Sequence, residues 1–432
     1  MGHVIIGNSA AAIAAVEAIR SVDESVPIRL YCDEANPIYS RCMLSYYLAG
    51  QVEEEKLRFR DDEWYDRMKV EAHLGTAVTR VNPKAKEVRL ADESAAKYDK
   101  VLIATGGRAR RLGRPGEELA GVFCLRNLPD AKGMSARLAE TRRAAVLGGG
   151  LVGLKTAYGL RERGLEVSVL VRSPHLMSQV VDARAGEVIR EQLEANGIEV
   201  RTGVDAKAIA GRDRVEAVEL SEGEPLECEM VVVGKGVDSN IDVVAESGIE
   251  THWGIITDKH MQTSAEDVYA AGDVAETEDL LSRERVVHAI WPNASEQGRV
   301  AGFNMAGEKR VYPGSLGMNA VEFYGSPVMA VGNVRPRGEG FEEIVDYRAE
   351  RGLYRKMVLK EGRLVGLLSV GQTRGTGTAL ALIKAGVPVE EIRDVIMSDK
   401  FDYAKILKLV KAYPEAFGQR EFRQTVEGAA AR

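Results

Sequence analysis

The residues of this chain with the clearest chemical meaning are glycines spaced as in a phosphate-binding turn. Gly148, Gly150 and Gly153 form an intact G-x-G-x-x-G between an apolar run and a helical pattern. Such glycines permit a tight turn and let N–H groups at a helix N-terminus reach a pyrophosphate. Simple tight packing is the alternative, and the strand–turn–helix context favours dinucleotide binding. The predicted contacts come from Gly148, Gly149, Gly150, Leu151, Val152 and Gly153.

The residue after the next predicted strand bears on the choice of dinucleotide. That strand, 166–171, is followed by Arg172 rather than by an acid. NAD sites normally have a carboxylate at this place, whereas an arginine can hold the 2′-phosphate of NADP. A solvent-facing strand-end arginine is supported equally well. The choice between NAD and NADP therefore stays open at this point.

A second, degraded copy of the glycine motif opens the chain. Ser9 takes the place of its second glycine and Ala12 that of its third. Glu34 follows about 20 residues later, where a carboxylate accepts hydrogen bonds from ribose hydroxyls. A small-residue helix packed on a sheet is the alternative, and the position at the N-terminus favours dinucleotide binding. The predicted contacts are Gly7, Asn8, Ser9, Ala10, Ala11 and Glu34.

Both motifs lie in strand–helix–strand patterns, which build parallel sheets. The first pattern covers 4–31 and the second 144–171, and after about 311 short strands precede a helical end. We therefore predict an α/β fold with two Rossmann-like dinucleotide-binding domains and a smaller C-terminal α+β domain. The predicted boundaries are 1–110 with 235–310 for the first domain, 111–234 for the second, and 311–432 for the third.

Composition excludes several classes of function. The chain has 432 residues, enough for two or three domains, and a formal net charge of −7, which argues against nucleic-acid binding. No apolar run is long enough to span a bilayer, and the opening segment 4–19 lacks the basic start of a signal peptide. The four cysteines show no metal-ligand or redox-pair spacing. We expect a cytoplasmic protein without a membrane or nucleic-acid partner.

The segment from Thr263 to Asp273, TSAEDVYAAGD, resembles a motif of the two-dinucleotide-binding-domain flavoproteins, or pyridine-nucleotide disulfide oxidoreductases. The resemblance implies that Gly272 and Asp273 bind FAD, with the Asp273 carboxylate accepting from a ribityl hydroxyl. A carboxylate buried at the end of an apolar strand needs such a donor. The turn after strand 100–104 resembles the second FAD motif of the family, through Ala104, Thr105 and Gly106. The likeness covers roughly 4–368.

Two further segments are similar to the rubredoxin and nitrite reductase branch of this family. The stretch YSRCMLS at 39–45 implies that Arg41 pairs with the FAD pyrophosphate as a bidentate cation. The stretch at 291–298 implies a helix whose positive N-terminus faces the flavin, with Trp291, Pro292 and Ala294 as contacts. A plain capped helix is the alternative for this second segment.

The chain departs from the family at two places of chemical interest. Cys42 stands where NADH oxidases and coenzyme A-disulfide reductases carry a redox cysteine, and the histidine that pairs with it there is Ala10 here. We favour a structural, flavin-adjacent cysteine over a catalytic one. Lys155 stands where many relatives carry a glutamate, and Tyr46 stands where they carry a lysine. We hypothesise that Lys155 faces the nicotinamide–flavin contact; a solvent-facing lysine is the alternative.

The resemblance implies an FAD-dependent NAD(P)H:acceptor oxidoreductase. Within the family, the chain is most similar to the flavin subunits of phenylglyoxylate dehydrogenase and tungsten aldehyde oxidoreductase complexes. This similarity implies an iron–sulfur partner in a hetero-oligomeric complex and electron flow from that partner to NAD. NAD is then favoured over NADP. The alternatives are a free-standing ferredoxin or rubredoxin reductase, an NADH oxidase or coenzyme A-disulfide reductase that uses Cys42, and a non-enzymatic dinucleotide sensor.

Overall fold

The computed structural model describes residues 1–418, which form two compact units. The first unit contains Met1–Leu170 and Val204–Leu316. The second contains Val171–Gly203 and the chain from Gly317 onward. The three-domain boundaries drawn from the sequence remain a prediction.

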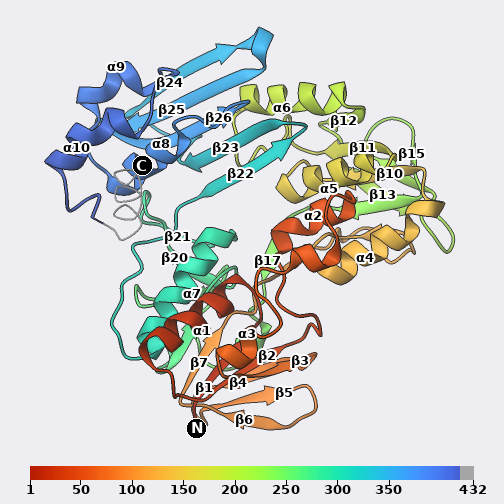
Figure 1. The fold of residues 1–432 in the computed structure, drawn as a ribbon. Helices are drawn as coiled ribbons and strands as arrows, with labels where there is room; N and C mark the ends of the chain where they lie inside the picture. Colours follow the sequence, from red (N-terminus) through yellow and green to blue (C-terminus); the bar gives the residue numbers. More distant parts are fainter. Residues whose placement is uncertain (419–432) are drawn as a thin grey trace. The chain divides into compact units, whose positions relative to one another are not determined.

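The N-terminal strand–helix–strand pattern forms the centre of a parallel sheet in the first unit (Figure 1). The strand order is β19-β7-β1-β2-β3. The strands are Val268–Ala270, Lys100–Ile103, His3–Ile6, Ile28–Cys32 and Val70–Leu74, and helix α1 is Ala10–Val22. The three central strands consist mostly of buried apolar residues, interrupted by Arg29 in β2, because both faces of a parallel sheet are covered.

The second pattern forms another set of parallel strands. Strand β10 pairs with β11 on one side and with β16 on the other, and β16 pairs with β9. These strands are Arg143–Leu147, Glu166–Val171, Met230–Val233 and Val122–Phe123, and helix α5 is Leu151–Glu162. The two Rossmann-like patterns predicted from the sequence are thus confirmed.

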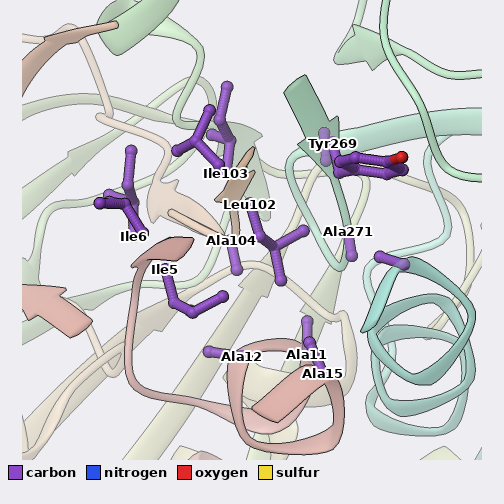
Figure 2. Close-up of a cluster of buried hydrophobic side chains, with 14 of the residues drawn as sticks. Ile5, Ile6, Ala11, Ala12, Ala15, Leu102, Ile103, Ala104, Tyr269 and Ala271 are labelled. Atoms are coloured by element: carbon purple, nitrogen blue, oxygen red, sulfur yellow. The ribbon is translucent and has the colours of Figure 1, made fainter. Parts of the chain in front are cut away.

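Helix α7 (Trp291–Met305) lies beside α1 in Figure 1, and glycines permit the close approach. A Cβ on Gly298 would lie 2.1 Å from the carbonyl oxygen of Ala11, and one on Gly302 would lie 2.3 Å from that of Ala15. The small side chains of α1 itself, among them Ala12, face the apolar strand residues of the sheet (Figure 2). The small-residue helix of the sequence therefore packs tightly, and its N-terminus stays at the edge of the sheet.

Gly298→Ala should lower the melting temperature by several degrees, because the two backbones must separate to admit the methyl group. Overpacking of this kind costs about 1–3 kcal/mol. The matched control is Gly377→Ala, also in a helix, where a Cβ would meet no atom within 4 Å. It should leave the melting temperature unchanged or raise it slightly. Thermal unfolding followed by circular dichroism measures both, and equal melting temperatures would contradict the packing argument.

The first unit also contains short antiparallel pieces and helices. The antiparallel strands are β4 (Val78–Asn82), β5 (Glu87–Leu90), β6 (Ala95–Lys97), β8 (Gly107–Ala109), β13 (Ala206–Ala210), β14 (Ala217–Leu220), β15 (Leu226–Glu227), β17 (Val237–Ser239) and β21 (Arg285–Val286). Two short strands, β18 (Ile255–Ile256) and β20 (Ala275–Glu278), pair in parallel. The remaining helices are α2 (Leu44–Leu48), α3 (Trp64–Arg67) and α4 (Leu128–Arg137).

The second unit is built on an antiparallel sheet of order β22-β23-β26-β25-β24. These strands are Met318–Phe323, Ser326–Gly332, Arg363–Val370, Leu353–Lys360 and Phe341–Arg348. The other elements of the unit are α6 (Ala183–Ala195), β12 (Ile198–Thr202), α8 (Thr376–Ala385), α9 (Arg393–Ile396) and α10 (Leu407–Ala412). The predicted fold class, α/β with a smaller α+β part, is confirmed. Within residues 1–418, no helix is long and apolar enough to cross a membrane.

Candidate functional site

A cavity of about 830 Å³ lies in the first unit. Strands β1, β7 and β19 all end at its wall, as ligand sites in open α/β sheets do. It is lined by nearly every residue predicted to contact FAD: Gly7, Asn8, Ser9, Ala10, Ala11, Glu34, Arg41, Cys42, Ala104, Thr105, Gly106, Gly272, Asp273, Trp291 and Ala294. Pro292, the remaining predicted contact, is at the start of α7 and does not line the cavity.

The first glycine motif shapes one wall of the cavity. Gly7 has φ +121°, and a Cβ on it would lie 2.2 Å from the carbonyl oxygen of Ala104, so packing alone requires glycine here. Ser9 is the N-cap of α1, and its side chain makes no capping hydrogen bond. Because the first N–H groups of a helix lack partners within the helix, Ser9 and the first turn present donors at the cavity.

Glu34 and Arg41 pair with each other on the cavity wall. Arg41 forms an ion pair with Glu34 and donates to the carbonyl oxygen of Arg126 at 3.0 Å. Tyr39 donates to the other Glu34 oxygen at 2.6 Å. Burial opposes the charge of Arg41, yet Tyr39 and Glu34 raise its pKa overall. The predicted ribose acceptor and the predicted pyrophosphate cation are thus held side by side.

Asp273, the predicted ribityl acceptor, pairs with a residue that the sequence reasoning missed. Arg126 donates to the Asp273 carboxylate at 2.8 Å and to the carbonyl oxygen of Gly107 at 2.8 Å. The two side chains are only 17% and 23% exposed for Asp273 and Arg126. The backbone N–H of Arg126 donates to Asp130, which also closes the capping box of α4 with Asn127. The N-L-P-D sequence of that capping box predicts a helix start beside Arg126, but it does not predict that Arg126 reaches the cavity.

Other lining residues were also missed by the sequence reasoning. They include Tyr31, Cys32, Asp33, Thr79, Arg108, Arg111, Asn127, Asp130, Asn240 and Asp242. Most of them lie outside recognisable motifs and reach the cavity through the pairing of distant strands.

Helix α7 directs its N-terminal end to the cavity. Trp291 and Ala294 line the wall, and the first turn of the helix contains no acidic residue. Gln297 accepts from the N–H of Gly272 at 2.8 Å, which fastens α7 to the Gly272–Asp273 turn. The positive end of a helix dipole therefore lies beside the same cavity as Asp273.

The three glycines of the second motif have different surroundings in the protein. A Cβ on Gly148, which has φ +131°, would lie 2.3 Å from the carbonyl oxygen of Gly234, and one on Gly153 would lie 2.3 Å from that of Gly148. Gly150, the N-cap of α5, has φ −85°, and a Cβ there would meet no atom within 4 Å. Protein packing therefore does not require glycine at 150, whereas the close approach of a dinucleotide does.

The remaining predicted nucleotide contacts follow the same turn or lie in the second unit. Val152, in the first turn of α5, is exposed, and Leu151 is half-buried. Arg172 is exposed directly after β11 and belongs to the second unit. The sequence predictions for these contacts remain predictions.

Lys155 has a defined surrounding on α5. Its Nζ atom lies 4.2 Å from the ring centroid of Tyr46 and 4.2 Å from that of Tyr158. Such cation–π contacts attract an ammonium group to the faces of aromatic rings and help to hold it in place. Lys155 is therefore positioned between α2 and α5, and it is half-buried.

The thiol of Cys42 faces the cavity without the surroundings of a reactive cysteine. Although Cys42 is exposed at the surface, desolvation by the surrounding protein raises the pKa of its thiol, and Asp273 adds to this, while Ser40 and Arg126 oppose it. Burial also raises the pKa of Cys32 to about 12. A raised pKa leaves the thiol protonated at neutral pH, so the structural interpretation of Cys42 is favoured.

Cys42→Ser should accordingly retain NADH-dependent dye reduction within about twofold, since a protonated thiol is a poor nucleophile. Alkylation of wild-type Cys42 by iodoacetamide should be slow near neutral pH and speed up only above the range in which ordinary thiols ionise. Mass spectrometry of the labelled peptide measures this. Loss of turnover in Cys42→Ser with FAD still bound would instead support the oxidase or disulfide reductase alternative.

Two Rossmann-like patterns, one opening on a large cavity with paired charges and the other on a glycine turn with room for a ligand, define a dinucleotide-binding oxidoreductase. The model of the family "Pyridine nucleotide-disulphide oxidoreductase" matches residues 1–298, and the chain belongs to this family. The resemblance inferred from the motifs is confirmed. The cofactors of this family are FAD and a nicotinamide dinucleotide.

Among similar proteins, the epsilon subunit of the NADH-dependent phenylglyoxylate dehydrogenase of Aromatoleum evansii is 32% identical, over 88% of this chain and 91% of that protein. Nitrite reductase [NAD(P)H] of Bacillus subtilis is 30% identical over 90% of this chain, which spans only about half (48%) of that longer protein. A ferredoxin reductase from Rhodopseudomonas palustris matches in structure with a TM-score of 0.82 and 28% identity, over 96% of this chain and 100% of that one.

Proposed function

We propose that this chain is an FAD-dependent NAD(P)H:acceptor oxidoreductase that serves as a flavin subunit and exchanges electrons between NAD(H) and an iron–sulfur partner. The observation that carries the proposal is the pair of candidate nucleotide sites in one unit, a cavity with two partly buried acid–cation pairs and a glycine turn with space at Gly150. Flavin, when bound, takes up a hydride and releases single electrons. The protein binds, orients and shields it.

Each side chain then has a defined task. Asp273 accepts from the ribityl chain, Glu34 accepts from the ribose, and Arg41 pairs with the FAD pyrophosphate. Arg108, Arg111 and Arg126 are further cations of the cavity wall. The turn from Gly148 to Gly153 holds the pyrophosphate of the nicotinamide dinucleotide. The NADH-dependent relative favours NAD as the coenzyme. Arg172 is also compatible with NADP, because an arginine at this place can hold its 2′-phosphate.

The partner is proposed from the relatives. One is a subunit of an NADH-dependent dehydrogenase, and another reduces a ferredoxin. The dehydrogenase subunit supports a role in a hetero-oligomeric redox complex. The ferredoxin reductase supports our second candidate function, a free-standing ferredoxin or rubredoxin reductase. We also propose a cytoplasmic location, which the free cysteines of the chain support because reducing compartments keep thiols unpaired.

Lys155→Met should slow the reduction of bound flavin by NADH about tenfold while FAD remains bound. The two tyrosine rings fix the ammonium group, and a fixed cation near the reacting rings favours the anionic reduced flavin. Tyr158→Phe keeps the ring and is the control, expected to leave the rate unchanged. Anaerobic stopped-flow absorbance gives both rates. An unchanged rate in Lys155→Met would make Lys155 a structural residue.

The proposed subunit role is tested by affinity purification of the chain from its native source. We expect it to co-purify with chains that contain iron–sulfur clusters, and the isolated chain to reduce dyes with NADH but to oxidise no organic substrate. Recovery of the chain alone, with efficient ferredoxin reduction, would favour the free-standing reductase. Oxidation of an organic substrate by the isolated chain would contradict the proposal.

A further inference from the structure

The last helical segment of the second unit has one face buried and one face exposed. A 3-10 turn, Tyr403–Ile406, continues into α10, Leu407–Ala412, shown in blue in Figure 1. Ile406 and Leu409 are 0% and 3% exposed, so this face packs into its own unit. The helix is therefore held in place, and its opposite face has a fixed arrangement.

The exposed face combines three lysines with two apolar side chains. Lys405, Lys408 and Lys411 recur every three residues, and Leu407 and Tyr413 are 43% and 41% exposed. We call these five residues the lysine face. Within residues 1–418, none of the three lysines forms an ion pair.

Some other cations of the same unit do form ion pairs. Arg348 pairs with Asp399, and Lys356 with Asp182. Like charges three residues apart on a helix repel one another, so the lysine face is unfavourable in isolation. The chain as a whole has a net charge of −7, so this positive surface differs in sign from the protein's overall charge. Binding of an acidic partner would reduce the repulsion among the three lysines.

We infer that the lysine face docks an acidic iron–sulfur protein, the electron-transfer partner of the proposed function, on which this inference rests. Transient redox complexes have small interfaces and depend on charge complementarity for encounter and orientation. Leu407 and Tyr413 supply the small apolar centre such an interface uses.

Other occupants fit less well. A lipid surface requires a broad apolar face beside the lysines, and here the apolar face of the helix is turned into its own unit. The remaining C-terminal residues, 419–432, contain three arginines and two glutamates and are not complementary to lysines. An acidic protein is the occupant that the charges favour.

The test uses the full chain with Lys405→Glu, Lys408→Glu and Lys411→Glu combined. The assays are NADH-dependent reduction of a plant-type [2Fe–2S] ferredoxin and of a rubredoxin, both acidic, and of ferricyanide as a small acceptor. We expect the KM for the protein acceptors to rise at least about tenfold at low salt, and ferricyanide turnover to be unchanged. Salt should raise the KM of the wild type and have little effect on the variant.

The matched control combines Lys84→Glu, Lys207→Glu and Lys259→Glu, three exposed lysines of the first unit. It makes the same change in net charge and should alter the KM less than about twofold. Equal KM values in wild type and lysine-face variant, or equal shifts in both variants, would overturn the docking surface and leave the proposed function intact. If the wild type reduces ferricyanide but neither protein acceptor, the proposed partner class fails, and the docking surface with it.

Two side measurements separate the other occupants. Phosphatidylserine vesicles are sedimented with wild type and lysine-face variant, and the oligomeric state of each is measured by light scattering. Vesicle binding lost in the variant with an unchanged KM would assign the face to lipid. A changed oligomeric state with an unchanged KM would assign it to a second copy of the chain. Either result would overturn the inference.

Discussion

Replacing Gly150 by valine should abolish the reduction of bound flavin by NADH while the protein stays folded and retains FAD. A Cβ at this position meets no atom within 4 Å, and the backbone has φ −85° and ψ 174°, which suits a β-branched residue. The protein itself therefore tolerates the substitution. The added side chain instead occupies the space through which a pyrophosphate approaches the N-terminus of α5.

We expect kcat/KM for NADH to fall at least about 100-fold, because loss of the pyrophosphate contacts misplaces the coenzyme. FAD content, melting temperature and photochemical reduction of the flavin should match the wild type. Gly153→Val is the contrasting variant, since a Cβ there would lie 2.3 Å from the carbonyl oxygen of Gly148 and should destabilise the fold. If Gly150→Val were reduced by NADH at the wild-type rate, this turn would not be the nicotinamide dinucleotide site.

Asp273→Ala should yield a protein that purifies largely without FAD. The substitution removes the proposed ribityl acceptor and also leaves the half-buried Arg126 without its carboxylate partner. Hydrogen bonds to charged groups are worth about 1.5–3 kcal/mol each, so FAD affinity should fall by about 10- to 100-fold or more.

The control for Asp273→Ala is Asp242→Ala. Asp242 also lines the cavity and pairs with an arginine, Arg108, but its side chain is exposed, and such surface pairs contribute little. Its FAD affinity should stay within about threefold of the wild type. Fluorescence titration of the apoproteins with FAD gives both dissociation constants. Similar FAD affinities for wild type and Asp273→Ala would remove Asp273 from the proposed site.

The fold was largely predictable because its signals are local. The glycine motifs stand directly between an apolar strand and a small-residue helix, and each of these elements forms where the pattern indicated. The edge strand β24 is harder to predict, because it mixes charged and apolar residues and has no continuous apolar run.

The site was predictable only where motifs carry its residues. Fifteen of the residues expected around FAD share one cavity wall, while Arg126 escaped notice because its partners, Asp273 and Gly107, are distant in the sequence. The mutual pairing of Glu34 and Arg41 could not be read from the sequence either, because it depends on how the segment after β2 folds back over the cavity. Long-range pairing of charges is set by tertiary structure, and motif reasoning does not reach it.

The central claim is that one polypeptide binds flavin and nicotinamide so that hydride passes between them. The most direct measurement is an anaerobic titration of the purified protein with NADH, followed by visible absorbance. The account predicts a yellow protein whose flavin absorbance is lost with one NADH per flavin. A colourless protein, or a flavin whose absorbance does not respond to NADH or NADPH, would contradict it.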